Sequence, residues 1–536
     1  MLSLAIWTPI VFGVVLLALG RDEHARVVRW IALIGALLGF LLTLPLYPQF
    51  DPTSTDMQFV EFMSWIPRFN INYHLGIDGI SFWFIPLTAF INVVVVLAAW
   101  EVIIERVNQY MGAFLILSGL MVGVFCALDG MLFYVFFEAT LIPMYLIIGV
   151  WGGPQRIYAA FKFFLYTLLG SLLMLVALIY LYIASEGSFD LATWHHLPLA
   201  STPQTLLFFA FFAAFAVKVP MWPVHTWLPD VHVEAPTGGS AVLAAIMLKL
   251  GAYGFLRFSL PIAPDASQEW AGLMLTLSLI AVVYVGLVAI VQQDMKKLVA
   301  YSSVAHMGFV TLGFFIFSDM GIQGGLVQMI AHGFVSAAMF LCIGVLYDRV
   351  HSREIASYGG VAHRMPRFAA FALLFAMANC GLPGTAGFVG EWMVILGAVK
   401  FQFGLGLLSA SALVLGAADV LGQGCDKGNH PPHPQLVPTL DTPPLSQCLG
   451  VFLYLVDAGL GNEGVHITAC RFVHEFFVRK VSQFFSCRST RHAHFALGSH
   501  DVVANKSLRF HLCPRQFVAK FFEGFGLVAL GAGANQ

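Results

Sequence analysis

The sequence predicts an all-α, polytopic membrane protein with about 13–14 transmembrane helices. Three observations support this fold class. Of the 536 residues, 59% are apolar and only 10% are charged, whereas about a quarter of a typical soluble domain is charged. Apolar runs of the roughly 20 residues needed to cross a bilayer recur along most of the chain. Basic residues gather in every second loop between these runs, as membrane topology requires.

The composition also excludes several classes of protein. A net charge of −2 argues against a basic nucleic-acid binder and against docking on anionic lipid through a polybasic face. The apolar content excludes disorder over most of the length. The eight cysteines include no Cys-x-x-Cys pair and are too few for a disulfide scaffold.

Thirteen apolar runs before residue 418 are interpreted as spans. They must be helices, because lipid offers the backbone no hydrogen-bond partner. The first run lacks a basic segment after Met1 and precedes another span, so we expect a retained anchor helix rather than a signal peptide. The predicted spans are residues 2–20, 27–46, 77–100, 111–128, 131–151, 160–184, 204–221, 239–261, 271–291, 298–317, 322–347, 368–399 and 404–417, the last of which is cut short.

Lys and Arg in the loops predict the orientation of the chain. Loops on one side carry eleven of these residues, among which we count Lys296, and loops on the other side carry only Arg68 and Lys400. The excess of basic residues marks cytoplasmic loops. The N-terminus is therefore predicted outside, and the loop 348–367 is predicted in the cytoplasm.

Two pairs of glycines have the spacing found where membrane helices pack closely. They are Gly35-xxx-Gly39 in the second span and Gly119-xxx-Gly123 in the fourth. Because glycine lets two helix backbones approach, we expect a neighbouring helix against each pair.

Four charged residues lie deep inside predicted spans. Lys218 and Lys249 lie in the seventh and eighth spans, and Glu138 and Glu391 lie in the fifth and twelfth. An ionisable group at mid-bilayer costs at least about 2.5–3.5 kcal/mol, so each needs a partner or a path to water. A charge pair that only holds helices together is the alternative, but such pairs are often close to neutral in energy. The sequence therefore favours a function for these residues.

Further ionisable groups lie in or beside the spans. Lys162 and Arg257 are near span ends, where we expect the long side chains to reach the interface. His306 and His332 lie inside adjacent spans, where they are either hydrogen-bonded packing residues or parts of a relay. A histidine takes up protons near neutral pH and can pass one between its two nitrogens. Carboxylates, lysines and histidines together indicate proton conduction, whereas residues 1–417 hold no cluster with metal-ligand spacing.

Two spans are interrupted by proline, and the interruptions suggest an internal repeat. Pro220 and Pro383 are 163 residues apart, and Glu138 and His306 are 168 residues apart. Each pair is offset by five spans, so the two halves should have opposite orientations, as in transporter folds with inverted repeats and broken helices. The predicted organisation is N-terminal helices 1–3 in residues 1–110, a first repeat in 111–261, an inverted second repeat in 271–417 and an atypical tail in 418–536.

Several stretches then give a specific resemblance. Residues 136–153, 218–240, 249–254 and 301–308 resemble the antiporter-like membrane subunits of proton-pumping NADH:quinone oxidoreductase, respiratory complex I. The second stretch is also similar to multisubunit cation/proton antiporters. Within the complex I family, residues 382–391 resemble the chain M (subunit 4) branch, in which Glu is expected at the position of Glu391 and related subunits usually have Lys. The resemblance covers roughly residues 1–417.

The resemblance implies a proton relay with assigned roles. Glu138 would be the carboxylate partner of Lys218, and Lys249 would be the central proton carrier. His306 and His332 would join Lys249 to the terminal proton site. The implied relay residues are Glu138, Lys218, Lys249, His306, His332 and Glu391.

The resemblance also implies partners and a location. The family carries no cofactor in this type of chain, since NADH, FMN, iron–sulfur clusters and quinone bind partner subunits. The expected partners are the lipid bilayer and other membrane subunits of the complex, especially antiporter-like neighbours, with no nucleic acid. No transit peptide precedes the first span, so we expect a bacterial inner membrane, with the mitochondrial inner membrane as the alternative. The alternative functions are a subunit of a cation/proton antiporter without redox chemistry and a purely structural membrane scaffold.

The tail departs from the rest of the chain. Residues 418–536 hold five of the eight cysteines and eight of the eighteen histidines. The family would instead complete the thirteenth helix and add a fourteenth. The tail is either an out-of-frame stretch, a lineage-specific soluble extension, or a metal site that uses residues such as Cys425, His430 and His433. The spacing of these residues matches no standard zinc pattern.

Overall fold

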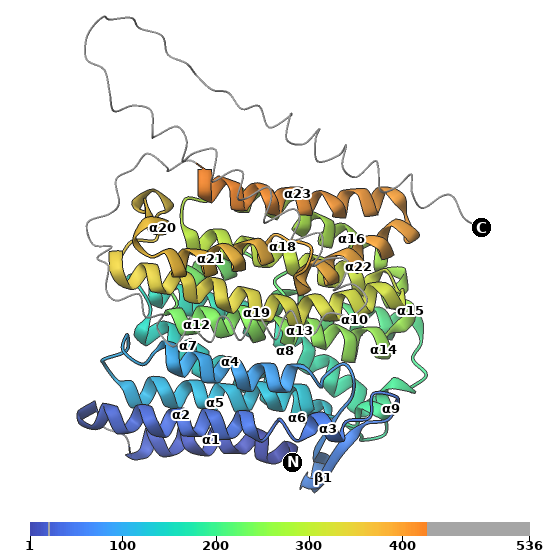
Figure 1. The fold of residues 1–536 in the computed structure, drawn as a ribbon. Helices are drawn as coiled ribbons and strands as arrows, with labels where there is room; N and C mark the ends of the chain where they lie inside the picture. Colours follow the sequence, from blue (N-terminus) through green and yellow to red (C-terminus); the bar gives the residue numbers. More distant parts are fainter. Residues whose placement is uncertain (20–21, 426–536) are drawn as a thin grey trace, which may run out of the picture. The chain divides into compact units, whose positions relative to one another are not determined.

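The structure is a computed structural model, and it describes residues 1–19 and 22–425. Within these ranges, nine helical segments are long and apolar enough to cross a membrane, and four shorter apolar helices accompany them. Each of the thirteen predicted spans overlaps one of these segments, so the helical, polytopic membrane fold is confirmed. Figure 1 shows their arrangement.

The helices have the following bounds: α1 (Leu2–Leu19), α2 (Ala25–Leu41), α3 (Leu46–Gln49), α4 (Phe84–Ala98), α5 (Val107–Cys126), α6 (Gly130–Ala139), α7 (Leu141–Trp151), α8 (Arg156–Ala184), α9 (Leu191–His195), α10 (Ser201–Lys218), α11 (Trp227–Glu234), α12 (Thr237–Val242), α13 (Leu248–Gly254), α14 (Leu260–Ile262), α15 (Pro264–Glu269), α16 (Ala271–Ile280), α17 (Gly286–Ile290), α18 (Met295–Phe315), α19 (Asp319–Val350), α20 (Val361–Arg364), α21 (Pro366–Asn379), α22 (Ala386–Phe401) and α23 (Phe403–Cys425). Helices α1, α2, α4 and α5 pack against one another, and α19 packs against α18, α21, α22 and α12 (Figure 1).

A β-hairpin joins the second and third spans, which the sequence analysis did not anticipate. Strands β1 (Gln58–Ile66) and β2 (Ile71–Ile77) are antiparallel, and Phe62 pairs with His74. Asn70 provides the left-handed residue at the turn (φ 52°), a conformation that asparagine tolerates. The predicted span 77–100 therefore begins as the end of a strand, and its helix α4 begins only at Phe84.

Both predicted interruptions are present. Helix α10 ends at Lys218, and the chain becomes helical again only at Trp227 of α11. Between α21 and α22 the backbone turns through Gly381 and Gly384, whose φ angles are 72° and 102°. Residues with a side chain rarely adopt these angles, which explains the glycines. The inverted relation between residues 111–261 and 271–417 stays a prediction.

The tail 418–536 is described only as far as Cys425, where α23 ends, so the predicted tail lies almost wholly outside the described residues. His430 and His433 are among the residues outside them.

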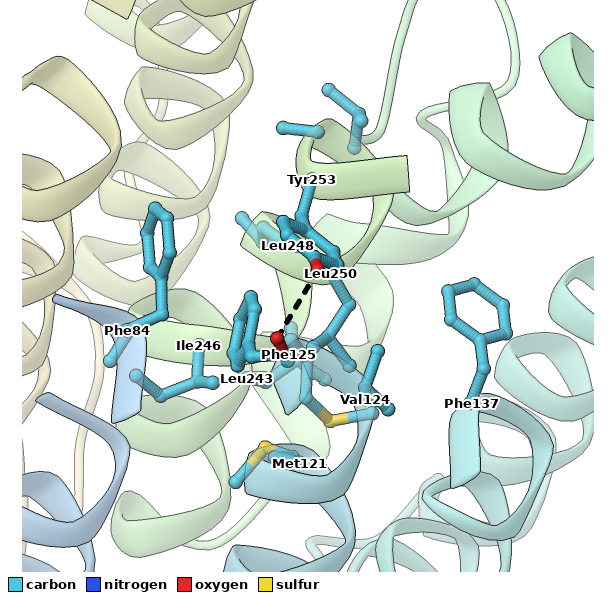
Figure 2. Close-up of a cluster of buried hydrophobic side chains, with 14 of the residues drawn as sticks. Phe84, Met121, Val124, Phe125, Phe137, Leu243, Ile246, Leu248, Leu250 and Tyr253 are labelled. Atoms are coloured by element: carbon cyan, nitrogen blue, oxygen red, sulfur yellow. Dashed lines mark hydrogen bonds between the residues drawn. The ribbon is translucent and has the colours of Figure 1, made fainter. Parts of the chain in front are cut away.

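Helix α13 has a π-helical turn at each end, and a dense apolar cluster surrounds it. The turns are η3 (Leu243–Met247) and η4 (Phe255–Ser259). Figure 2 shows aromatic side chains from α4, α5, α6 and α13 around this segment. The rings of Phe84 and Phe125 are stacked with centroids 4.9 Å apart, and Tyr253 meets Phe125 edge-on at 5.2 Å. A single π turn in a helix often marks a functional site.

The glycine pairs lie at close helix contacts, with one exception. A Cβ on Gly119 would lie 2.3 Å from the Ile6 carbonyl oxygen of α1, and a Cβ on Gly35 would lie 2.7 Å from Phe12. A Cβ on Gly123 would lie 2.8 Å from the Phe136 ring. At Gly39 the nearest atom is 3.6 Å away, which is an ordinary contact distance.

Replacing Gly119 by alanine is expected to destabilise the protein. The new methyl group would collide with backbone of α1, and overpacking of this kind costs roughly 1–3 kcal/mol. The thermal unfolding temperature of the detergent-purified protein should fall for Gly119→Ala. The matched control is Gly39→Ala, which has room for the methyl group and gains roughly 0.5–1 kcal/mol of helix propensity. Equal unfolding temperatures for the two variants would contradict the close packing of α1 on α5.

Candidate functional site

Lys249 is buried inside the protein and contacts a histidine. Lys249 is 0% exposed, and its Nζ lies 2.7 Å from His332 Nδ1. The ammonium also donates a hydrogen bond to the Ala244 carbonyl oxygen at 2.5 Å, within the π turn η3. His332 is itself 3% exposed. The pair is therefore shielded from water, and no carboxylate of the described residues contacts Lys249 directly.

The row continues from His332 to Glu391. The rings of His332 and His306 have centroids 5.5 Å apart. His306 Nδ1 lies 2.7 Å from Glu391 Oε1. Lys249, His332, His306 and Glu391 thus form one row that draws a residue each from α13, α19, α18 and α22. His306 is partly exposed, and the other three residues are buried.

Helix α19 holds the row together at two points. Gln328 and His332 are four residues apart, so both project from the same face of α19. His332 reaches Lys249, and Gln328 Nε2 donates a hydrogen bond to Glu391 Oε1 at 2.9 Å. Gln328 was not among the residues predicted from the sequence, although its spacing from His332 was a signal that could have identified it.

Glu138 and Lys218 lie near each other but form no ion pair in the described part of the chain. Lys218 is 2% exposed, and its Nζ lies 4.5 Å from the centre of the Phe137 ring without a hydrogen-bond partner among the described residues. One oxygen of Glu138, Oε1, is also buried and accepts no hydrogen bond from residues 1–19 or 22–425. The charge of Glu138 acts on Lys218 across the intervening space. Buried polar atoms are seldom left unpaired, so this arrangement suits groups that exchange partners.

A glycine brings the two lysine sites together. A Cβ on Gly251 would lie 2.9 Å from the Lys218 Cβ. Gly251 is two residues beyond Lys249 on α13, so α10 crosses α13 next to the central lysine. A larger residue at position 251 would push the helices apart.

A small cavity adjoins the Glu391 end of the row. It has a volume of about 40 Å³, and its walls include His306, Glu391, Ser302 and Asn379. Asn379 Nδ2 donates a hydrogen bond to Ser302 Oγ at 3.1 Å. A cavity of this volume can hold a water molecule, and these four polar side chains stand among otherwise apolar walls. It lies where α21 breaks before α22, so the interrupted helix borders the cavity.

Three basic residues differ from their sequence-based placement. Lys296, counted above as a loop charge, is 5% exposed and donates a hydrogen bond to the Ala235 carbonyl oxygen at 2.7 Å. The reason is that α18 begins at Met295, three residues before the predicted span. Lys162 and Arg257, expected to extend to the interface, instead bind carboxylates. Lys162 Nζ is 2.6 Å from Asp230, and Arg257 Nη2 is 2.7 Å from Asp78.

His232 is a further buried histidine that the sequence analysis did not select. It is 0% exposed, and its ring stacks on Phe340 with centroids 4.4 Å apart. Neither ring nitrogen has a hydrogen-bond partner among the described residues. The charges of Lys249 and Lys296 both act on it. Among the residues that the structure describes, no three His, Cys, Asp or Glu side chains gather as metal ligands would.

Comparison with known proteins gives the same family as the motifs. A family profile described as "NADH:quinone oxidoreductase/Mrp antiporter, TM" matches residues 127–416. NADH-quinone oxidoreductase subunit M of Rhodobacter capsulatus is 52% identical over 437 residues, which cover 78% of this chain and 85% of that protein. NADH-ubiquinone oxidoreductase chain 4 of Arabidopsis thaliana is 48% identical over 418 residues, covering 78% and 84%.

A solved structure extends the likeness to three dimensions. A chain of respiratory complex I from Thermus thermophilus with bound NADH superposes with a TM-score of 0.78 at 33% identity. The match covers 88% of this chain and 98% of that one. With the buried lysines, the broken helices and the family profile in agreement, the chain belongs to the NADH:quinone oxidoreductase/Mrp antiporter transmembrane family.

Proposed function

We propose that this chain is the proton-translocating subunit M of an NADH:quinone oxidoreductase, respiratory complex I. It moves protons across the membrane while NADH oxidation and quinone reduction take place in other subunits. The observation that carries the proposal is the row of Lys249, His332, His306 and Glu391. Its two outer pairs, Lys249–His332 and His306–Glu391, are each 2.7 Å apart, and the two histidine rings between them have centroids 5.5 Å apart. The subunit M relatives at 52% identity and lower support the redox complex.

The relay works by passing a proton between groups that can each bind and release one. Lys249 gives its proton to His332, and histidine can take a proton on one nitrogen and release it from the other. A turn of the ring or a water molecule bridges the space between His332 and His306, and Glu391 receives the proton at the end.

Lys218 and Glu138 control when Lys249 loses its proton. A cation on Lys218, next to α13, repels a second cation on Lys249, and this repulsion is strong where water is excluded. When Glu138 neutralises Lys218, Lys249 can hold a proton, and when the two separate, Lys249 releases it. The unpaired buried atoms of Glu138 and Lys218 support a pair that opens and closes.

The remaining parts of the proposal concern partners and place. The electron carriers NADH, FMN, the iron–sulfur clusters and quinone bind in partner subunits, and this chain holds none of them. Its direct neighbours are other antiporter-like membrane subunits in a bacterial inner membrane. Residues 111–261 and 271–417 act as two inverted repeats, each of which contains one broken helix. A cation/proton antiporter without redox chemistry is the second candidate, and Glu391 favours the first.

Substituting the control pair is expected to stop proton pumping. Glu138→Gln or Lys218→Ala removes one of the two charges, so Lys249 no longer receives the signal to release its proton. Pumping by the complex in liposomes, measured with a pH-sensitive dye, should fall to near background. Electron transfer from NADH to an artificial acceptor in the peripheral arm should be unchanged.

The controls are Glu269→Gln and Lys400→Ala, which change the same residue types at exposed positions. Both controls should pump normally. Normal pumping by Glu138→Gln or Lys218→Ala, in a fully assembled complex, would sink the assignment.

Removing the Gln328 amide is expected to slow pumping without ending it. Gln328→Leu takes from Glu391 a donor that stabilises the carboxylate, so release of the proton slows. A hydrogen bond to a charged group contributes about 1.5–3 kcal/mol, which corresponds to a slowing of roughly tenfold or more. Gln323→Leu, on the exposed face of the same helix, is the control. If both variants pump at the same rate, Gln328 has no part in the relay.

The two candidate functions differ in what accompanies the protein. Affinity purification from gently solubilised membranes should bring flavin and iron–sulfur proteins with the chain. A cation/proton antiporter would bring only small membrane subunits. Isolation of the chain with such subunits alone, together with transport driven by ion gradients without NADH, would replace the proposal by the second candidate.

A further inference from the structure

The segment from α13 through η4 carries a second polar row, which starts at Lys249 of the relay and continues through two residues that the relay does not use. Lys249, Tyr253 and Arg257 follow one another at intervals of four residues. This spacing puts all three on one face of the helix. At 1.5 Å per residue, Arg257 stands roughly 12 Å along the helix from Lys249. The row leads from the centre of the relay to Asp78, which follows β2 of the hairpin.

Arg257 is held at both ends of its guanidinium group. Its Nε donates a hydrogen bond to the Tyr253 hydroxyl at 3.2 Å, and its Nη2 donates to Asp78 Oδ1 at 2.7 Å. The Tyr253 hydroxyl in turn donates to the Phe125 carbonyl oxygen at 3.2 Å, the contact drawn in Figure 2. Tyr253 is 1% exposed and Arg257 is 5% exposed. The row is therefore fixed in position and enclosed.

The ion pair at the end of the row stays charged. Burial disfavours the carboxylate of Asp78, but the charge and hydrogen bond of Arg257 outweigh burial and hold the pKa of Asp78 below its usual range. Asp78 also accepts hydrogen bonds from the backbone N–H groups of Ile80 and Ser81. It is therefore a poor acceptor for a proton that travels along the row at neutral pH.

Arginine itself blocks proton passage in two ways. A guanidinium does not lose its proton in proteins, so Arg257 cannot pass one from Tyr253 to Asp78. Its fixed positive charge also repels protons that approach from the hairpin side, as arginines do in pores that exclude protons. The loop charges predict that this side faces outward, where proton pumping accumulates protons.

We propose that Arg257, positioned by Tyr253 and Asp78, seals the hairpin side of Lys249 against protons. The seal rests on the proposed function, because it matters only if Lys249 carries protons. It leaves the row through His332, His306 and Glu391 as the route by which the Lys249 proton moves. Arg257 is a sealing residue rather than a carrier, and Tyr253 and Asp78 are its positioning residues.

The test measures proton leak without turnover. The purified complex is placed in liposomes, an inward or outward pH gradient is imposed in the absence of NADH, and the decay is followed with an internal dye. Removal of one charge at about 12 Å, with an effective dielectric constant of about 20, alters the barrier for a proton roughly tenfold. Arg257→Gln should therefore leak roughly tenfold faster than the unchanged complex. Arg257→Lys keeps the charge and should restore most of the seal.

The matched control is Arg106→Gln, which removes an exposed arginine from a loop on the opposite side. It should not leak. Equal leak in Arg257→Gln and Arg106→Gln would overturn the seal. So would loss of pumping in Arg257→Gln without any leak, because the arginine would then lie on the proton path.

Two further measurements separate the seal from simple misfolding and from the proposed function. Electron transfer from NADH to an artificial acceptor reports assembly. If Arg257→Gln does not assemble, Asp78→Asn takes its place, because it keeps the arginine but removes the carboxylate that positions it. The Asp78→Asn complex should leak protons faster than Arg106→Gln. An Asp78→Asn complex that does not leak would overturn the proposal. Failure of the proposed function shows elsewhere, as normal pumping by Lys218→Ala.

Discussion

The contact between Lys249 and His332 is the interaction on which the site depends. A buried lysine in a membrane is costly unless something receives its hydrogen bonds or its proton. Here one bond goes to the Ala244 carbonyl oxygen of a π turn, and the other contact is with a histidine rather than a carboxylate. A carboxylate would hold the proton on the lysine. A histidine at this position leaves the lysine proton free for the proposed transfer.

The helix breaks and glycines follow from the need to bring such groups together in an apolar protein. Gly251 lets α10 approach α13 at Lys218, and Gly381 and Gly384 let the chain turn beside the cavity at Glu391. Irregular backbone in a membrane is tolerated where protein or a polar cavity surrounds it. The irregular segments therefore lie beside the charged groups, while long regular helices such as α8 present apolar side chains to the outside.

Much of this arrangement could be predicted from the sequence, because lipid makes each polar residue in a span conspicuous. The spans, both breaks and the candidate residues Lys249, His306, His332 and Glu391 follow from that contrast, and the structure places these four in one row. Where no resemblance assigned a role, contacts between distant segments could not be predicted. Arg257 and Asp78 are 179 residues apart, so their pairing depends on the folded hairpin. Lys296 was misplaced because a shift of three residues in a helix start decides between loop and interior.

Helix α19 gives the proposed relay a property that its separate contacts do not have. His332 and Gln328 project from one face of the same helix. His332 contacts Lys249 at one end of the row, and Gln328 contacts Glu391 at the other. A rotation of α19 about its axis would lengthen the Lys249 and Glu391 contacts in the same movement. Both contacts would then form or break together. A displacement of this one helix by a neighbouring subunit would therefore be enough to open or close the whole row.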